Sequence, residues 1–326
     1  MADFAHKWTD DQIERLEALL QRLYGKTAAE MGRTLDDLMQ EHMAKYGEDL
    51  EARLDVDGTP EGNRARDSWL TGQAAAFATV AGAVVAPLVA IGLEAERKRE
   101  ELINAALPEV YAQNHNFTCY VVDRKLKSRR GRKSNVKVQI DFNLMDKDTA
   151  RLLLNPTFKV VPGSRATSLH EAWYRTKLRA CITRGILRGD SIPRMAKDIR
   201  TVTDMSRNAA VRAARTACTH AENAGRIRGM ERAIAMGIPV KKVWEATLDN
   251  RTRDSHRDLD GEVREVHERF SNGLMEPGDY SGDPAEYYNC RCTLNNVIEG
   301  IDSGKGERWN RFDDGEDYES WKAGWK

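Results

Sequence analysis

The pattern of apolar side chains changes after Pro239. Much of the chain up to Met236 has helical spacing, and the last helical stretch is rich in Ala. Gly237 and Pro239 follow that stretch in the order that ends a helix. Between 240 and 300 no long helical period remains, and short apolar runs alternate with Gly, Pro and Asp turns. The sequence therefore predicts an α+β fold, mainly α-helical in its N-terminal and central regions, with a small α+β module near the C-terminus.

A β-hairpin with a basic tip is predicted within residues 116–164. Residues 117–122 and 136–142 are rich in β-branched and aromatic side chains, and Gly131 lies between them as a turn residue. The connecting segment carries a cluster of positive charges: Arg124, Lys125, Lys127, Arg129, Arg130, Arg132 and Lys133. One interpretation is a solvated loop. The other is a finger that binds the phosphates of double-stranded DNA, because clustered Lys and Arg release counterions from nucleic acid.

Two further segments delimit the predicted organisation. Residues 1–115 form a helical region, and within it residues 74–93 lack any charged side chain. About 20 such residues suffice to cross a bilayer, but Ala and Gly dominate here and Pro87 interrupts the run. A helix buried among other helices and a contact with a membrane both remain open. Residues 301–326 form a predicted acidic-aromatic tail whose aromatic side chains anchor it to a partner.

Bulk composition excludes some classes of protein. The chain has 326 residues, enough for two or three domains, and its 51 Lys and Arg balance its 51 Asp and Glu. The total charge therefore does not indicate a nucleic-acid binder. Five cysteines is an odd number, and three of them are widely scattered, which argues against a disulfide framework. The N-terminus lacks the pattern of a secretory signal, so folding in a cytoplasm is expected.

Metal-binding side chains are concentrated between Trp244 and the end of the module. Cys290 and Cys292 offer two thiolates, and His256 and His267 offer two imidazoles, which together can complete a tetrahedral zinc shell. Such a zinc site would stabilise a region with few apolar side chains. The alternative is purely structural. In that case both cysteines alternate along a strand and face one core, while His256 makes an ordinary hydrogen bond.

Catalysis by the same residues is a further interpretation. His256 can act as a general base supported by Asp249 or Asp260, or a histidine can activate Cys290 as a nucleophile. Neither arrangement has the signals that normally accompany it. The sequence has no Gly-rich phosphate loop, no G-x-S-x-G elbow and no H-E-x-x-H motif. We therefore predict no catalytic residue, and keep a metal-dependent enzyme acting on nucleic acid or nucleotides as the alternative.

The order of residues in this region resembles the phage head-morphogenesis family, the Mu F-like minor head proteins. The matching residues are Trp244, Asp249, Arg251, Thr252, Arg253, His256, Leu259, Asp260, Gly261, Asn289, Cys290, Arg291 and Cys292. The preceding helix is also similar to the family's, through residues 214–216, Ala221, Asn223 and Gly225, although Ala217 stands where an acidic residue is common. The resemblance covers residues 165–300, and this stretch is the predicted head-morphogenesis domain.

The resemblance implies a minor capsid protein of a tailed bacteriophage. Such a protein lies in the virion at the portal vertex and acts in head assembly, with a further role in DNA packaging or ejection. The implied partners are the portal protein, a capsid or scaffold protein, and double-stranded DNA, with membrane contact during ejection left open. The family implies no catalytic activity, and the only cofactor expected from the residues is zinc.

Overall fold

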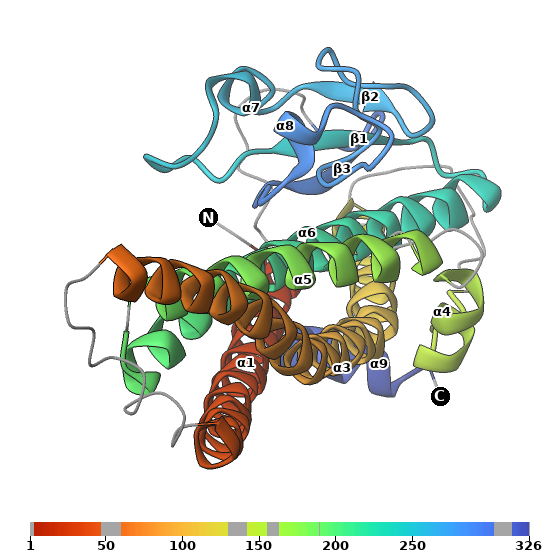
Figure 1. Ribbon diagram of the computed structural model, residues 1–326. Helices are drawn as coiled ribbons and strands as arrows, with labels where there is room; N and C mark the ends of the chain where they lie inside the picture. The colour runs from red at the N-terminus through yellow and green to blue at the C-terminus, as the bar shows by residue number, and fades with distance from the viewer. Residues whose placement is uncertain are drawn as a thin grey trace. The chain divides into compact units, whose positions relative to one another are not determined.

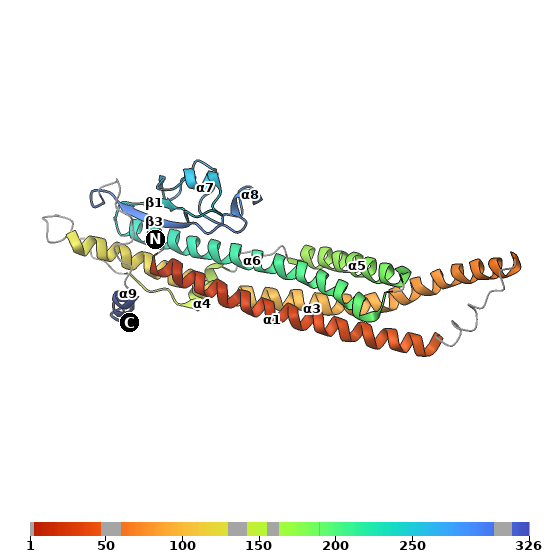
Figure 2. The same cartoon turned by 90° about the vertical axis from the view of Figure 1, so that its left-hand side faces the viewer.

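The computed structural model is mostly helical. It describes residues 3–46, 60–129, 142–154, 163–188, 190–302 and 315–325. The larger helices are α1 (Phe4–Tyr46), α3 (Pro60–Arg129), α4 (Lys147–Leu154), α5 (Gly163–Arg188), α6 (Ile192–Ala235) and α9 (Gly315–Ala323). A small C-terminal module adds β1 (Val240–Glu245), α7 (Asp254–Asp258), β2 (Val263–Glu265), α8 (Pro284–Tyr287) and β3 (Thr293–Ile298), as Figures 1 and 2 show. The predicted α+β class is confirmed.

The chain divides into two compact units that are discontinuous in sequence. Unit 1 comprises residues 1–18, 102–160 and 211–326, and unit 2 comprises residues 19–101 and 161–210. The helices α1, α3 and α6 each contribute residues to both units. The units therefore do not follow the predicted linear regions, since residues 165–300 are divided at position 210.

Unit 2 is a helical unit with an aliphatic core. Side chains of α1, α3, α5 and α6 meet there, among them Leu35, Leu88, Leu178 and Ile199, all fully buried. The uncharged segment enters this core, because Val84, Val85, Leu88 and Val89 are buried in it, as the buried-helix interpretation expects. Within the part of the chain that the structure describes, no helix combines the length and apolarity needed to cross a bilayer.

Unit 1 contains the only sheet of the described residues, a three-stranded antiparallel sheet in the order β2-β1-β3. Val243 pairs with Val263 on one side and with Asn295 on the other. Every residue of β3 is buried. The sheet shares a core with α3 and α6, in which the fully buried Trp244 is the largest side chain.

The prediction of a first hairpin strand at residues 117–122 is wrong. Residues 117–122 lie inside α3, and every residue from 110 to 123 is buried. The helix is buried on all sides because α1, α6, β3 and α9 of unit 1 contact it around its circumference. Its β-branched and aromatic residues therefore reflect complete burial in a helix. The second predicted strand, 136–142, falls almost entirely outside the described residues.

The C-terminal tail packs on its own chain. Tyr318 of α9 is fully buried among Phe4, Phe117 and Tyr120. The indole nitrogen of Trp321 donates to Asp123 at 2.8 Å. The aromatic anchors predicted for residues 301–326 are therefore present, but in the described part of the tail they bind unit 1 instead of a separate partner.

Candidate functional site

Three side chains of the C-terminal module converge in the interior of unit 1. His256 lies in α7, and Cys290 and Cys292 precede β3. Nδ1 of His256 is 3.6 Å from Sγ of Cys290 and 3.4 Å from Sγ of Cys292. The three potential ligand atoms all lie within 4.8 Å of one another, and each residue is at most 2% exposed. We call this group the His-Cys cluster.

The two thiols of the cluster interact with each other. A hydrogen bond between them raises the pKa of Cys290 and lowers the pKa of Cys292, while burial raises both. The structure thus favours proton loss from Cys292, the cysteine nearer to the imidazole.

The fourth predicted ligand lies elsewhere. The side chain of His267 is 73% exposed, and its Nδ1 lies 3.9 Å from the carboxylate of Glu231 on α6. It follows β2 in a turn, so the short strand carries it towards solvent and away from the cluster. Among the described residues the structure brings together His256, Cys290 and Cys292, and does not add His267.

A carboxylate that the sequence analysis missed completes the surroundings of His256. Glu286 of α8 lies 3.1 Å from Nε2, the ring nitrogen that faces away from the sulfurs. Its carboxylate also accepts hydrogen bonds from the hydroxyl of Ser255 at 3.1 and 3.2 Å. Nothing in the spacing of Glu286 signals this role, because α8 is a four-residue helix reached through irregular turns.

An ion pair holds the segment between the two cysteines. Arg291 donates to both carboxylate oxygens of Asp249, each at 2.6 Å. Arg291 first, and then the amide of Arg251, hold the pKa of Asp249 below its ordinary value. Because Arg291 is fixed on one side of the backbone, the neighbouring cysteines are both directed into the interior.

The other family-pattern residues also serve to shape this loop. Asp260 accepts from the amide of Ala246, and the amide of Gly261 donates to the carbonyl of Trp244 at 2.8 Å. Gly261 has a φ of 81° and Asn289 a φ of 54°, the left-handed region that Gly and Asn tolerate best. Arg253 donates to the carbonyl of Tyr288, at 2.5 Å. The motif is therefore largely a set of turns and ion pairs.

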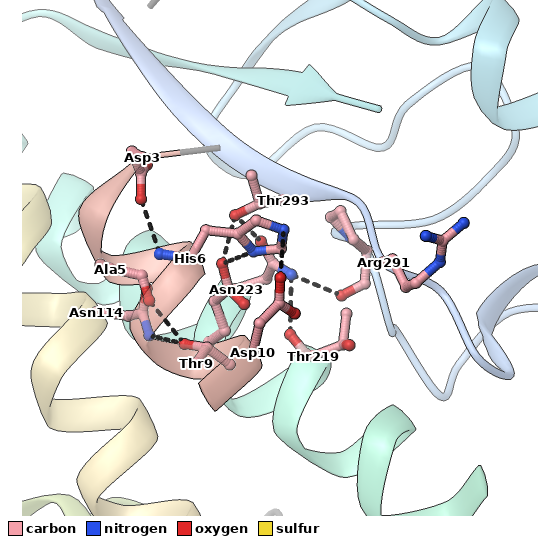
Figure 3. A network of polar contacts seen from close by, with 12 residues as sticks. Asp3, Ala5, His6, Thr9, Asp10, Asn114, Thr219, Asn223, Arg291 and Thr293 are labelled. Carbon is pink, nitrogen blue, oxygen red and sulfur yellow. Dashed lines mark hydrogen bonds and ion pairs between the residues drawn. The ribbon is translucent and has the colours of Figure 1, made fainter. Parts of the chain in front are cut away.

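A polar network joins the N-terminus of α1 to α6 and β3 (Figure 3). Arg226 donates to both carboxylate oxygens of Asp3, at 2.6 and 2.8 Å, although these residues are 223 positions apart. His6 lies 2.8 Å from Glu222, which also accepts from the hydroxyl of Thr293 at 2.6 Å. Burial opposes the charged form of His6, but Glu222, together with Asp10 and Asp3, outweighs it and raises the pKa of His6 to about 9.

The Asn223 side chain connects this network to the cluster. Its amide nitrogen donates to the carbonyls of Thr219 and Pro277, and its oxygen accepts from the amide of Leu294 at 2.8 Å. Thr219 in turn donates to the carbonyl of Cys290 at 2.9 Å. Residues of α6 therefore position the backbone that carries both cysteines.

The predicted basic segment is only partly described. Lys125 is buried, and its Nζ donates to the carbonyl of Asn296 at 2.6 Å and to Asp302 at 3.1 Å. Arg124 pairs with Asp317 and Lys127 with Asp123. Lys125 therefore supports the fold instead of binding phosphate. Arg129 ends α3, and Arg130, Arg132 and Lys133 lie outside the described residues.

Comparisons with known proteins identify the C-terminal half. Residues 176–295 match the family model described as Phage Mu protein F like protein. The predicted resemblance to this family is confirmed over these residues, and the matched stretch contains the whole His-Cys cluster.

Two relatives are similar to this chain. One is minor head protein GP7 of Bacillus phage SPP1, 32% identical over 203 residues, which cover 61% of this chain and 62% of that protein. The other is NAD(+)--arginine ADP-ribosyltransferase EFV of Enterococcus faecalis, 33% identical over 158 residues, which cover 46% of this chain and 32% of that protein. The chain thus spans less than two thirds of either relative. No solved structure matches it at a significant level.

Proposed function

We propose that this chain is a minor head protein that acts in assembling the head of a tailed bacteriophage. The observation that carries the proposal is the match to minor head protein GP7, which extends over 61% of the chain and agrees with the family model for residues 176–295. In the virion, we place it at the portal vertex, with the portal protein and a capsid or scaffold protein as partners.

The geometry of unit 1 supports docking over catalysis. His256, Cys290 and Cys292 are each at most 2% exposed, so their reactive atoms are not presented to a substrate at the surface. Arg226 and Asp3, the strongest pair of the polar network, are equally buried and satisfied by each other. Groups that are closed off and internally paired maintain a shape.

The test is the composition of assembled particles. Proheads and virions purified from a phage that encodes this chain should contain it in a few copies, detected by mass spectrometry of the particles. A tagged chain should also co-purify with the portal protein when the two are co-expressed. Particles without the chain would refute the head function, and failure to bind the portal alone would refute only the placement at the vertex.

Binding of double-stranded DNA is a finer part of the proposal. Lys125 is assigned to the fold, and Arg124 and Lys127 are paired with Asp317 and Asp123. The remaining candidates are Arg129, Arg130, Arg132 and Lys133. Replacing the four by Gln should weaken filter binding and reduce the salt dependence, by about 0.9 in log–log slope for each phosphate that the variant no longer neutralises. The control replaces Arg175 and Arg179, exposed on α5, by Gln. An equal change in both variants would contradict a local DNA-binding segment.

The second relative favours an enzymatic alternative through its name. The match covers 32% of that transferase, so the shared region is one part of a larger protein and need not contain the named activity. We propose that the shared part is a common head-type module. Incubation with NAD⁺ and an arginine acceptor should give no product above a chain-free control, and any divalent-metal-dependent nuclease activity should be absent. Activity abolished by His256→Ala would support the enzymatic alternative instead.

A further inference from the structure

We infer that the His-Cys cluster binds one zinc ion, through Nδ1 of His256 and the thiolate sulfurs of Cys290 and Cys292. Sulfur and imidazole nitrogen together are the donor set that zinc prefers in proteins. The ligand set differs from the one the sequence suggests, since His267 is excluded by its position. The inference does not depend on the proposed function, because a metal site stands whether or not the chain enters phage heads.

The separations of the ligand atoms fit a tetrahedral ion. Zn–S bonds of about 2.3 Å and Zn–N bonds of about 2.0–2.1 Å place tetrahedral N and S ligands about 3.5–3.6 Å apart. The two observed N···S distances are 3.4 and 3.6 Å. Both N···S separations therefore match a tetrahedral ion, and all three ligand atoms lie within 4.8 Å of one another.

Hydrogen bonding alone explains the cluster less well. A neutral imidazole has one acceptor nitrogen with one lone pair, and that nitrogen faces two sulfurs at nearly equal distance. Only one thiol can donate along the lone pair, so the other sulfur has only the neighbouring thiol as its hydrogen-bond partner in the cluster. A metal ion between the three atoms satisfies the nitrogen and both sulfurs together.

The far side of the imidazole has the arrangement expected around a metal ligand. Nε2 lies 3.1 Å from the carboxylate of Glu286, so an Nε2–H donates to that acceptor and leaves the lone pair on Nδ1. Ser255 donates to the same carboxylate and fixes its orientation. Glu286 acts as a positioning residue: it sets the tautomer and rotation of the ring and does not touch the ion.

The cysteines are held before any metal arrives. The Asp249 carboxylate fixes Arg291 between them, and Thr219 fixes the carbonyl of Cys290. The Trp244 ring packs edge-on against the His256 ring, with centroids 5.2 Å apart. Three ligands on restrained backbone lower the entropy lost on binding, which favours a tightly bound ion.

Three of the four ligands of a tetrahedral zinc ion are present among the described residues. Binding releases the two thiol protons to solvent as the thiolates form, and the charge of the ion is balanced by both sulfurs. Affinity for zinc should consequently fall as pH is lowered.

The experiment measures metal in the whole chain. Protein purified from zinc-supplemented cells should contain stoichiometric zinc by atomic emission, and a chelator should release that zinc together with two newly reactive thiols. Replacement by Co²⁺ should give the intense thiolate-to-cobalt absorption of a tetrahedral site. Cys290→Ser and Cys292→Ser should each abolish stoichiometric zinc, whereas Cys218→Ser, a buried cysteine outside the cluster, should retain it.

Two more variants separate a metal site from a merely structural one. His267→Asn should keep full zinc, and a loss there would overturn the ligand set. Glu286→Gln should lower zinc affinity about 10- to 100-fold with the fold retained, while Glu268→Gln on the exposed turn of the same module should not. The cobalt spectrum of the unaltered chain serves if the cysteine variants do not fold. No zinc and no sulfur-to-cobalt absorption in the unaltered chain, or a Cys290–Cys292 disulfide, would overturn the inference.

Discussion

The two units of this chain are built on different kinds of core. Unit 2 packs aliphatic faces of α1, α3, α5 and α6, and its buried acid, Glu96, accepts from the hydroxyls of Tyr24 and Tyr174. Unit 1 buries charged residues from distant parts of the sequence, with Arg226 between Asp3 and Glu222. An aliphatic core specifies little beyond volume and period, whereas a buried ion pair requires particular partners. The family motif lies in unit 1, the unit whose buried ion pairs require particular residues.

The largest expected difference between the two units comes from removing one buried cation from each. Arg226→Met leaves the carboxylate of Asp3 buried without its cationic partner, although Glu222 keeps His6 and Thr293, and should lower the free energy of unfolding by about 3–5 kcal/mol. Arg99→Met in unit 2 should cost less, because Glu96 keeps both tyrosine hydroxyls. Urea unfolding followed by circular dichroism measures both, with hydrogen exchange to assign the loss to a unit. Equal losses would contradict the distinction.

Two glycines test how closely the helices of each unit approach. A Cβ at Gly225 of α6 would lie 2.3 Å from the carbonyl oxygen of Tyr111 on α3, a backbone atom within unit 1. A Cβ at Gly92 would lie 2.8 Å from the ring of Tyr174, a side chain within unit 2. A ring can shift where a helix backbone cannot. Gly225→Ala should therefore destabilise by about 2–3 kcal/mol, and Gly92→Ala by less. Thermal unfolding measures the loss of stability in each variant. A larger loss in Gly92→Ala would show that the α3 backbone can shift at Tyr111 to make room for the added Cβ.

The sequence predicted more of the C-terminal site than of the helical regions. Residue type alone singles out His256, Cys290 and Cys292, either as zinc ligands or as parts of a structural core, and the structure brings the three together. Glu286 and the exclusion of His267 depend on turns between β2 and β3, whose course no periodicity encodes. The network around Arg226 depends on a partner 223 residues away, which local patterns cannot indicate.

The misassigned strand at 117–122 has a different cause. Apolar periodicity distinguishes a strand from a helix only when one face is exposed. In α3 every residue from 110 to 123 is buried, so polar positions such as Thr118 and Cys119 do not mark a solvent face. The β-branched and aromatic residues at 117–122 therefore favour a strand in the sequence. In the structure, packing against the surrounding elements of unit 1 stabilises a helix instead. Nor does the sequence indicate that Lys125 is buried and that its Nζ donates to Asn296 within β3.

The smallest expected difference between the units concerns pH. The pKa of His6 in unit 1 is raised to about 9 by Glu222, Asp10 and Asp3 against the effect of burial. A raised pKa means that the folded state holds a proton more tightly than the unfolded state. The resulting stability is complete below pH 6.5 and is lost as pH rises through about 9. In unit 2, burial lowers the pKa of His170, so its effect has the opposite sign and destabilises the fold as pH falls.

One site changes the free energy of unfolding by at most about 1.4 kcal/mol per pH unit, so the effect is measured as a difference between variants. Unfolding of the unaltered chain and of His6→Gln at pH values from 6 to 9 should converge as pH rises, because the imidazolium is lost from the former. The His170→Gln variant is the matched control, and its difference from the unaltered chain should not shrink over this range. Parallel curves for His6→Gln would mean that Glu222 is held by Arg226 and Thr293 alone, and that the charge on His6 adds nothing to the attachment of α1.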